Sequence, residues 1–210
     1  IYKKDYSLFN LKISVPGLKN KTIKKIKLNL IGKHNILNSA AAIALSLHIG
    51  VKIKIIKNSL KKFSGIQRRL TKVFSIKGRE FFDDYAHHPT EIKSVLKSLK
   101  ATSLDRKLVS VFQPHRYSRL KSLKKDFVSA FKDSDLVVLC PVYSAGEKID
   151  RKYNAIEFAK SISKSSNVQV IIVKNENELK KFFNKNLIEN EIVVCMGAGS
   201  ISKWIREMNL

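Results

Sequence analysis

The densest group of reactive side chains lies in the string Asp-Asp-Tyr-Ala-His-His-Pro-Thr-Glu at residues 83–91. It follows a strand-like apolar run, and a helical pattern begins at Thr90. Ligands of open α/β sheets bind at the carboxyl ends of strands, so carboxylates, a phenol and imidazoles there favour a substrate and nucleotide site. Two other interpretations stay open. Thr90 could simply cap a helix, or His87 and His88 could ligate a metal ion, although neighbours in an extended chain point in opposite directions.

A second string, Phe-Gln-Pro-His-Arg-Tyr-Ser-Arg at residues 112–119, follows the next predicted strand. Its loop should therefore lie beside the first one. Arg116 and Arg119 share one face if a helix begins here. Positive charge at a helix start opposes the macrodipole, so this pair predicts a bound anion such as a carboxylate or a phosphate. Two solvated arginines without a ligand are the alternative.

Three further strings carry weaker signals. In residues 32–39, Asn35 and Asn38 lie one helical turn apart, and their amides offer the donor and acceptor that a nucleobase edge needs, although asparagine also caps helices. The string Gly-Ile-Gln-Arg-Arg at residues 65–69 places paired arginines where a phosphate or ribose could bind. Gly-Ala-Gly-Ser at residues 197–200 is half of a dinucleotide fingerprint, and we interpret it as a tight turn from strand to helix.

The elements that must position these strings alternate between strand and helix after residue 69. Apolar runs predict strands at 80–83, 107–112, 136–140, 168–173 and 192–196. Helical periodicity predicts helices at 90–99, 120–131, 153–163, 176–183 and after Ser200. This alternation is typical of βα units in a mostly parallel sheet, so the fold class is α/β.

The first third of the chain has a different organisation. Strands are predicted at 8–15 and 26–30, followed by helices at 34–49 and 53–63. We place a domain boundary at residues 69–74, which gives domains of 1–69 and 70–210.

Composition limits the classes of function. The 210 residues carry 41 Lys and Arg against 17 Asp and Glu, a net charge of +24. The basic residues include only eight arginines and are spread along the chain, which favours a solvated surface over a specific nucleic-acid site. A basic nucleic-acid-binding α/β domain is the alternative. No apolar run reaches the ~18–20 residues of a membrane helix, so we expect no membrane insertion. Cys140 and Cys195 lie in apolar runs, and we expect reduced, buried thiols and a cytoplasmic protein.

The strings, taken in order, resemble the Mur ligases. The shared sequence features run from about Leu30 to Trp204 as Gly-x-His-Asn-x-x-Asn, Gly-x-x-Arg-Arg, Asp-Asp-Tyr-x-His-His-Pro-Thr-Glu, Phe-Gln-Pro-His-Arg-Tyr-x-Arg, Val-Tyr-x-Ala-Gly-Glu and Gly-Ala-Gly. Within the family they are most similar to the members that join L-alanine to UDP-N-acetylmuramate. The resemblance implies that residues 1–69 are the end of a central ATP-binding domain and that residues 70–210 are a Rossmann-like, amino-acid-binding C-terminal domain.

The resemblance also implies two groups of ligand-binding residues. Two amides would contact adenine, and an arginine and a carboxylate would reach the ribose and phosphates of ATP: Asn35, Asn38, Arg69 and Asp84. L-alanine would be bound by a phenol, an imidazole and two arginines that take its carboxylate: Tyr85, His87, Arg116 and Arg119. No residue is assigned with certainty to catalysis, none to a metal, and the roles of His88 and His115 stay open.

The implied reaction makes an amide bond in peptidoglycan precursor synthesis, and so serves cell-wall formation, cell shape and division. ATP phosphorylates the muramyl carboxylate, the amine of alanine attacks the acyl phosphate, and phosphate leaves. The sequence contains no Gly-x-x-x-x-Gly-Lys-[Ser/Thr] loop for ATP phosphates, and the family's Mg²⁺ ligands would lie upstream of Ile1. We therefore expect part of a ligase, inactive by itself; an inactive ligase remnant is the alternative.

Overall fold

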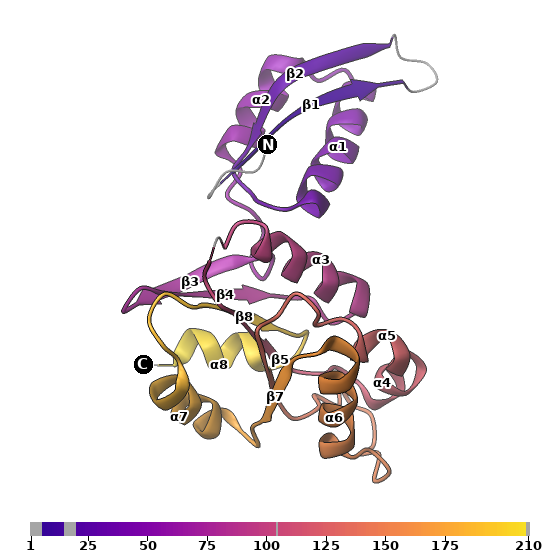
Figure 1. Cartoon of the computed structure of the whole chain (residues 1–210). Coiled ribbons are helices and arrows are strands. Elements are labelled where there is room, and N and C mark those ends of the chain that lie inside the picture. The colour runs from indigo at the N-terminus through magenta and orange to yellow at the C-terminus, as the bar shows by residue number, and fades with distance from the viewer. Residues whose placement is uncertain (1–5, 15–19, 104, 209–210) are drawn as a thin grey trace. The chain divides into compact units, whose positions relative to one another are not determined.

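The computed structural model describes residues 6–14, 20–103 and 105–208. The chain divides into two units, Ile1–Gly65 and Ile66–Leu210 (Figure 1). Each unit has its own cluster of buried apolar side chains. The sequence predicts a boundary after Arg69, and the division of the structure falls between Gly65 and Ile66.

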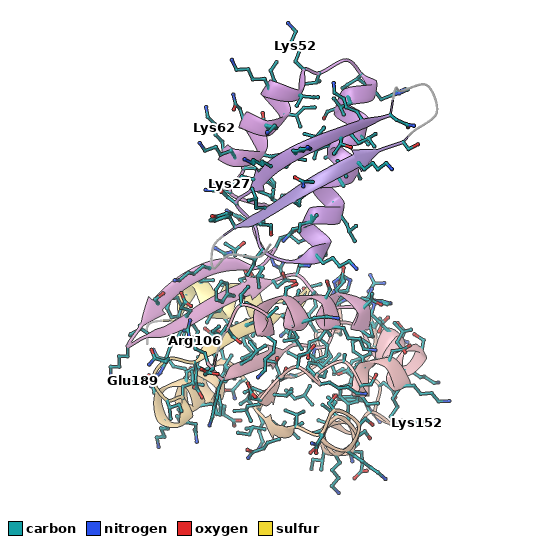
Figure 2. The ribbon with its side chains drawn as sticks, turned by 45° about the horizontal axis from the view of Figure 1, so that its top comes forward. Lys27, Lys52, Lys62, Arg106, Lys152 and Glu189 are labelled. Carbon is teal, nitrogen blue, oxygen red and sulfur yellow. The ribbon has the colours of Figure 1, made fainter. Side chains whose placement is uncertain are left out.

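The first unit packs two helices on a two-stranded antiparallel sheet. Its elements are β1 (Ser7–Ile13), β2 (Lys21–Leu28), α1 (Lys33–His48) and α2 (Ile53–Lys62). All four contribute to one apolar cluster, which contains Ile13, Ile23, Ile26, Ile43 and Ile56. Lys52 and Lys62, at the two ends of α2, project outward from this unit (Figure 2).

The second strand of this unit begins earlier than the sequence predicts. The buried side chains Ile23 and Ile26 are separated by an irregularity in the pairing, and Lys25 has a φ of 54°. An extra residue in a strand breaks the two-residue alternation, so the alternation indicates a strand only from Ile26 onward. The last residue of the other predicted strand, Val15, lies outside the described residues.

The second unit is built on a six-stranded sheet with the order β3-β4-β8-β5-β6-β7. β3 (Thr71–Ile76) pairs antiparallel with β4 (Arg79–Asp84), and every other pair is parallel. The remaining strands are β5 (Leu108–Phe112), β6 (Leu136–Leu139), β7 (Gln169–Ile172) and β8 (Ile192–Met196). All residues of β5 and β8 are buried, as in strands covered on both faces. The predicted α/β class with a mostly parallel sheet is confirmed.

The helices of this unit are α3 (Pro89–Lys100), α4 (Tyr117–Ser122), α5 (Lys124–Val128), α6 (Ala155–Ser166), α7 (Glu176–Asn186) and α8 (Ile201–Glu207). The single helix predicted at 120–131 is wrong, because Leu123 leaves the helical region with φ −113° and ψ 21°. Its carbonyl accepts the N–H groups of Asp126 and Phe127 and so starts α5. Phe127 and Phe131 of this segment are nevertheless buried and pack on Phe112.

Both cysteines, Cys140 and Cys195, are buried free thiols, as the sequence predicts. Within the described ranges, no helix combines the length and the apolar character that crossing a membrane requires.

The parallel strands end in register at one edge of the sheet. Asp84 of β4 pairs with Met196 of β8, Met196 pairs with Phe112 of β5, and Phe112 pairs with Leu139 of β6. The loops that follow these strands therefore start side by side. The loop after β8 lies between the two reactive strings, since β8 separates β4 from β5 in the sheet.

The opposite edge of the sheet is held by Arg106 (Figure 2). Its guanidinium pairs with Glu80 of β4 and donates to the carbonyls of Gly78 (3.1 Å) and Asn190 (2.8 Å). These bonds join the start of β4 to the turn before β8, so the register of the two strands is also fixed from the far end.

Candidate functional site

Asp84, the last residue of β4, braces the segments on either side of it. Its carboxylate is 2% exposed and accepts the N–H of Leu70 at 2.6 Å and the N–H of Ala86 at 2.7 Å. The first bond holds the chain directly after Arg69, and the second holds the loop that carries Tyr85. Asp84 therefore fixes two predicted ligand-binding residues in place. Its assignment to ATP stays a prediction.

The neighbouring carboxylate, Asp83, faces the other side of the sheet. One of its oxygens accepts from Ser202 Oγ at 2.6 Å and from Arg206 Nε and Nη2 at 3.0 and 2.9 Å. These bonds anchor α8 to β4. The alternation of side chains along a strand thus separates a structural aspartate from the one that faces the loops.

His88 caps the helix that follows. Its Nδ1 accepts the N–H of Thr90 at 3.3 Å, while the Glu91 carboxylate accepts the N–H groups of His87 (3.0 Å) and His88 (3.2 Å). The interpretation of Thr90 as the cap is wrong, because the helix begins at Pro89, which needs no N–H partner in the first turn. Burial raises the pKa of Glu91, but these hydrogen bonds and nearby positive charge outweigh it and leave the pKa lowered.

His87 has a defined orientation. Its Nδ1 lies 2.9 Å from the Tyr85 carbonyl, which can only accept, so Nδ1 carries the hydrogen and Nε2 is the acceptor of the neutral ring. The ring centroid lies 5.1 Å from that of Tyr85 and 5.6 Å from that of His115. The two reactive strings therefore meet through their imidazoles. The residues that the structure describes contain no group of three or more His, Cys, Asp or Glu side chains that could hold a metal ion.

The second string is fastened to the loop after β6. Arg116 precedes α4 with a φ of 69°, and its N–H donates to the Tyr143 carbonyl at 2.9 Å. The Tyr143 N–H in turn donates to the carbonyl of Pro114 at 2.8 Å. The His115 ring stacks on the Tyr143 ring, with centroids 5.7 Å apart, and Arg119 Nη1 lies 3.1 Å from His115 Nδ1. The two arginines thus flank the start of α4, with the Arg116 side chain exposed.

Glu147, in the loop after β6, binds the first turn of α4. Its carboxylate accepts the N–H of Ser118 at 3.2 Å and is bonded to the Ser118 hydroxyl. The side-chain bond from Ser118 is the largest influence, and it lowers the pKa of Glu147. Neither Tyr143 nor Glu147 was assigned a role from sequence. Their only signal was the Val-Tyr-x-Ala-Gly-Glu string, which does not indicate its contact with residues 114–118.

The turn after β8 lies between the two strings, because β8 lies between β4 and β5 in the sheet. Gln113 accepts the N–H of Ile201 and donates to Ser200 Oγ, both at 3.0 Å. A Cβ placed on Gly199 would come within 2.4 Å of Tyr143 Cγ and 2.5 Å of Gln113 Oε1. Only glycine allows this close approach, so the interpretation of residues 197–200 as a tight turn is confirmed.

The paired arginines before β3 have different environments. Arg68 Nη2 donates to the Gly197 carbonyl at 2.6 Å, and its guanidinium carbon lies 4.6 Å from the centre of the Tyr85 ring. The Arg69 side chain is 49% exposed and lies 4.0 Å from Glu91. Arg68 therefore links two loops, whereas Arg69 retains donors for an anion. The sequence indicated the pair but not this division.

Asn35 and Asn38 belong to the first unit. Asn35 is 8% exposed and donates through Nδ2 to the Ile31 carbonyl at 2.8 Å, whereas Asn38 is exposed. Their assignment to adenine stays a prediction.

The buried Asp84 carboxyl should make the free energy of unfolding depend on pH. Burial raises the pKa of this carboxyl from 3.8 to about 6, against the hydrogen bonds from Ala86 and Leu70, which lower it. Because ionisation costs more in the folded than in the unfolded protein, the free energy of unfolding should fall by about 3 kcal/mol between pH 4 and pH 6. Carbon-13 NMR of the carboxyl should show a midpoint near pH 6.

The Leu70 and Ala86 amide signals should shift with the same midpoint as the Asp84 carboxyl. Asp84→Asn should remove this part of the pH dependence, while Asp126→Asn, at an exposed carboxylate, should leave it. A carboxyl midpoint near the ordinary value of 3.8 would refute the prediction.

The chain is similar in sequence to known proteins. The family model of the Mur ligase, glutamate ligase domain matches residues 68–199. The UDP-N-acetylmuramate–L-alanine ligase of Pelagibacter ubique is 50% identical over 98% of this chain and 44% of that protein. The ligase of the same name from Ruthia magnifica is 43% identical over 84% of this chain and 38% of that protein.

Solved structures agree with the sequence matches. The UDP-N-acetylmuramate-alanine ligase of Thermotoga maritima superimposes with a TM-score of 0.73 and 28% identity, covering 96% of this chain and 44% of that one. A murein peptide ligase from Psychrobacter arcticus shares the fold, with a TM-score of 0.65 at 18% identity, over 98% of this chain and 45% of that one. The chain thus spans less than half the length of these relatives. Because the family model covers more than half of its 210 residues, the chain belongs to the Mur ligase family.

Proposed function

We propose that this chain is the amino-acid-binding part of an ATP-dependent ligase that joins L-alanine to UDP-N-acetylmuramate in peptidoglycan precursor synthesis. The observation that carries the proposal is the pair Arg116 and Arg119 at the carboxyl edge of the sheet, beside the imidazoles of His87 and His115. The identity to ligases of that name supports the choice of substrates. Residues 70–210 would bind the amino acid, and residues 1–69 would complete an ATP-binding domain.

Two arginines suit the carboxylate of an amino acid. A guanidinium can donate two parallel hydrogen bonds to a carboxylate, and such charge-assisted bonds fix the orientation of the ligand as well as binding it. With the carboxylate held by Arg116 and Arg119, the amine is free to face the reacting carbonyl. His87 offers Nε2 as an acceptor for the ammonium, because its Nδ1 hydrogen is used by the Tyr85 carbonyl. Tyr85 would line the same pocket.

Formation of the amide bond then requires mainly that the reactants are correctly positioned and that their charges are stabilised. The ammonium first loses one proton to give the neutral amine. The amine forms a bond to the acyl carbon, the bond from that carbon to the phosphate oxygen breaks and inorganic phosphate leaves, and the nitrogen gives up a second proton to solvent. Holding the amine against the acyl phosphate turns the attack into an intramolecular step. Arg69, half-exposed beside Glu91, is available to the phosphates of ATP, and Asn35 and Asn38 would serve adenine. We expect Mg²⁺ to accompany ATP in the full-length ligase and assign it no ligands among the described residues.

The proposal predicts which substrate depends on the two arginines. In the full-length ligase that would contain this chain, Arg116→Lys should raise the KM for L-alanine about 10- to 100-fold, because an ammonium cannot replace a bidentate guanidinium. Arg119→Lys should act in the same direction. The KM values for ATP and UDP-N-acetylmuramate should change little. Initial rates measured against each substrate in turn, with the other two saturating, test this.

The matched control for the arginine variants is Arg151→Lys, at an exposed position shortly before α6. It should leave all three KM values unchanged. If the alanine KM stays constant in both site variants while the ATP KM rises, the arginines serve phosphates and the assignment is wrong.

The 210-residue chain should not catalyse the reaction by itself. Its sequence has no phosphate-binding loop of the Gly-x-x-x-x-Gly-Lys-[Ser/Thr] type. Phosphate release from ATP, measured with UDP-N-acetylmuramate and L-alanine present, should equal the background without protein. Release that depends on both substrates would contradict the prediction.

The net charge of +24 should give only unspecific binding to nucleic acid. Binding driven by phosphate neutralisation falls steeply as salt rises, because it depends on counterion release. Fluorescence anisotropy with two unrelated DNA duplexes should give equal affinities that weaken together with salt. A sequence preference that persists at physiological salt would favour the nucleic-acid-binding alternative.

A further inference from the structure

His115 is at the centre of the site, yet the proposed reaction does not use it. Its ring stacks on Tyr143 on one side and approaches His87, with centroids 5.6 Å apart, on the other. Its backbone is held by the bridge to Tyr143. A ring fixed in this way, with Arg119 Nη1 only 3.1 Å from its Nδ1, suggests a role that acts through the arginine.

The contact with Arg119 determines which ring nitrogen of His115 carries the hydrogen. A guanidinium is a donor only, so His115 Nδ1 must accept, and the hydrogen of the neutral ring lies on Nε2. His87 has the opposite arrangement, because its Nδ1 donates to the Tyr85 carbonyl. A doubly protonated His115 would have no lone pair for Arg119 and would place two positive groups in contact.

The surroundings of His115 favour the neutral ring. Burial is the first cause that lowers its pKa, followed by the electrostatic influence of the neighbouring Arg119, His87 and Arg116 side chains. Glu147 acts in the other direction, and its carboxylate is committed to Ser118 at the start of α4. Tyr143 faces the ring by stacking on it.

We infer that His115 is a positioning residue that holds the Arg119 guanidinium for the carboxylate of the incoming amino acid. One N–H of Arg119 is used by His115, and the rest of the planar group is fixed in direction for a ligand. Protonation of His115 releases Arg119, so the site loses affinity for the amino acid as the solution becomes acidic. The inference rests on the proposed function for the identity of the ligand, but the contact between the two side chains does not.

Two substitutions of His115 test whether Arg119 needs the hydrogen-bond acceptor or the imidazole ring itself. His115→Asn places an amide oxygen near the Nδ1 position and can accept from Arg119 at any pH, whereas His115→Leu cannot accept at all. In the full-length ligase, His115→Leu should raise the KM for L-alanine about 10- to 100-fold with little change in the KM for ATP. His115→Asn should stay within a few-fold of the wild type. His48→Leu, at an exposed histidine of α1, is the control and should change neither value.

The pH profile provides a readout that a purely structural role would not change. In the wild type, the alanine KM should rise as the pH falls through the His115 pKa, which lies below the ordinary 6.5. In His115→Asn this rise should be absent or much smaller, because the amide does not titrate. An equal rise in both proteins, or an unchanged alanine KM in His115→Leu, would overturn the inference.

Nitrogen-15 NMR of the 210-residue chain tests the contact without any enzymatic assay. At neutral pH, Nδ1 of His115 should show the shift of an unprotonated nitrogen and Nε2 that of a protonated one, and Arg119→Gln should raise the His115 pKa. A hydrogen on Nδ1 would overturn the inference and leave the proposed function intact. If the tautomer is as inferred but Arg119→Lys leaves the alanine KM unchanged, the proposed function fails, and the inference fails with it.

Discussion

The in-register pairing of the parallel strands is the constraint on which the rest of this structure depends. Asp84, Met196, Phe112 and Leu139 end their strands at one edge of the sheet, so loops distant in sequence begin next to one another. Apolar burial on both faces of β5 and β8 keeps these strands in place. A shift of register in one strand would separate the imidazoles and arginines that now share one edge.

Polar side chains then fix the loops at that edge. Asp84 holds two segments through backbone N–H groups, Gln113 holds the turn after β8, and Glu147 holds the start of α4. The bonds from Leu70, Ile201 and Ser118 join residues distant in sequence, and the bond from Ala86 fixes the start of the loop directly after β4. The backbone that carries the exposed side chains of Arg69 and Arg116 is thereby fixed before a ligand binds. Such a site is preorganised.

Much of this arrangement was predictable from sequence, because local signals carry it. The apolar runs indicated β4, β5, β6, β7 and β8, and the reactive strings indicated which loops matter. Other features depend on distant contacts. β3 pairs with β4 through an irregularity between Lys72 and Phe74, and this shift of register breaks the alternation that marks a strand. The roles of Asp84, His88 and Glu147 rest on backbone N–H partners, and residue type does not specify those partners.

The central claim is that the carboxyl edge of this sheet binds the carboxylate of an amino acid. Nitrogen-15 chemical shifts of the labelled 210-residue chain, followed during titration with L-alanine, test it most directly. The account predicts shifts concentrated at residues 85–88, 113–119 and 143–147, and none on titration with ethylamine, which has the amine but no carboxylate. Equal shifts with both compounds, or shifts confined to other parts of the chain, would contradict it.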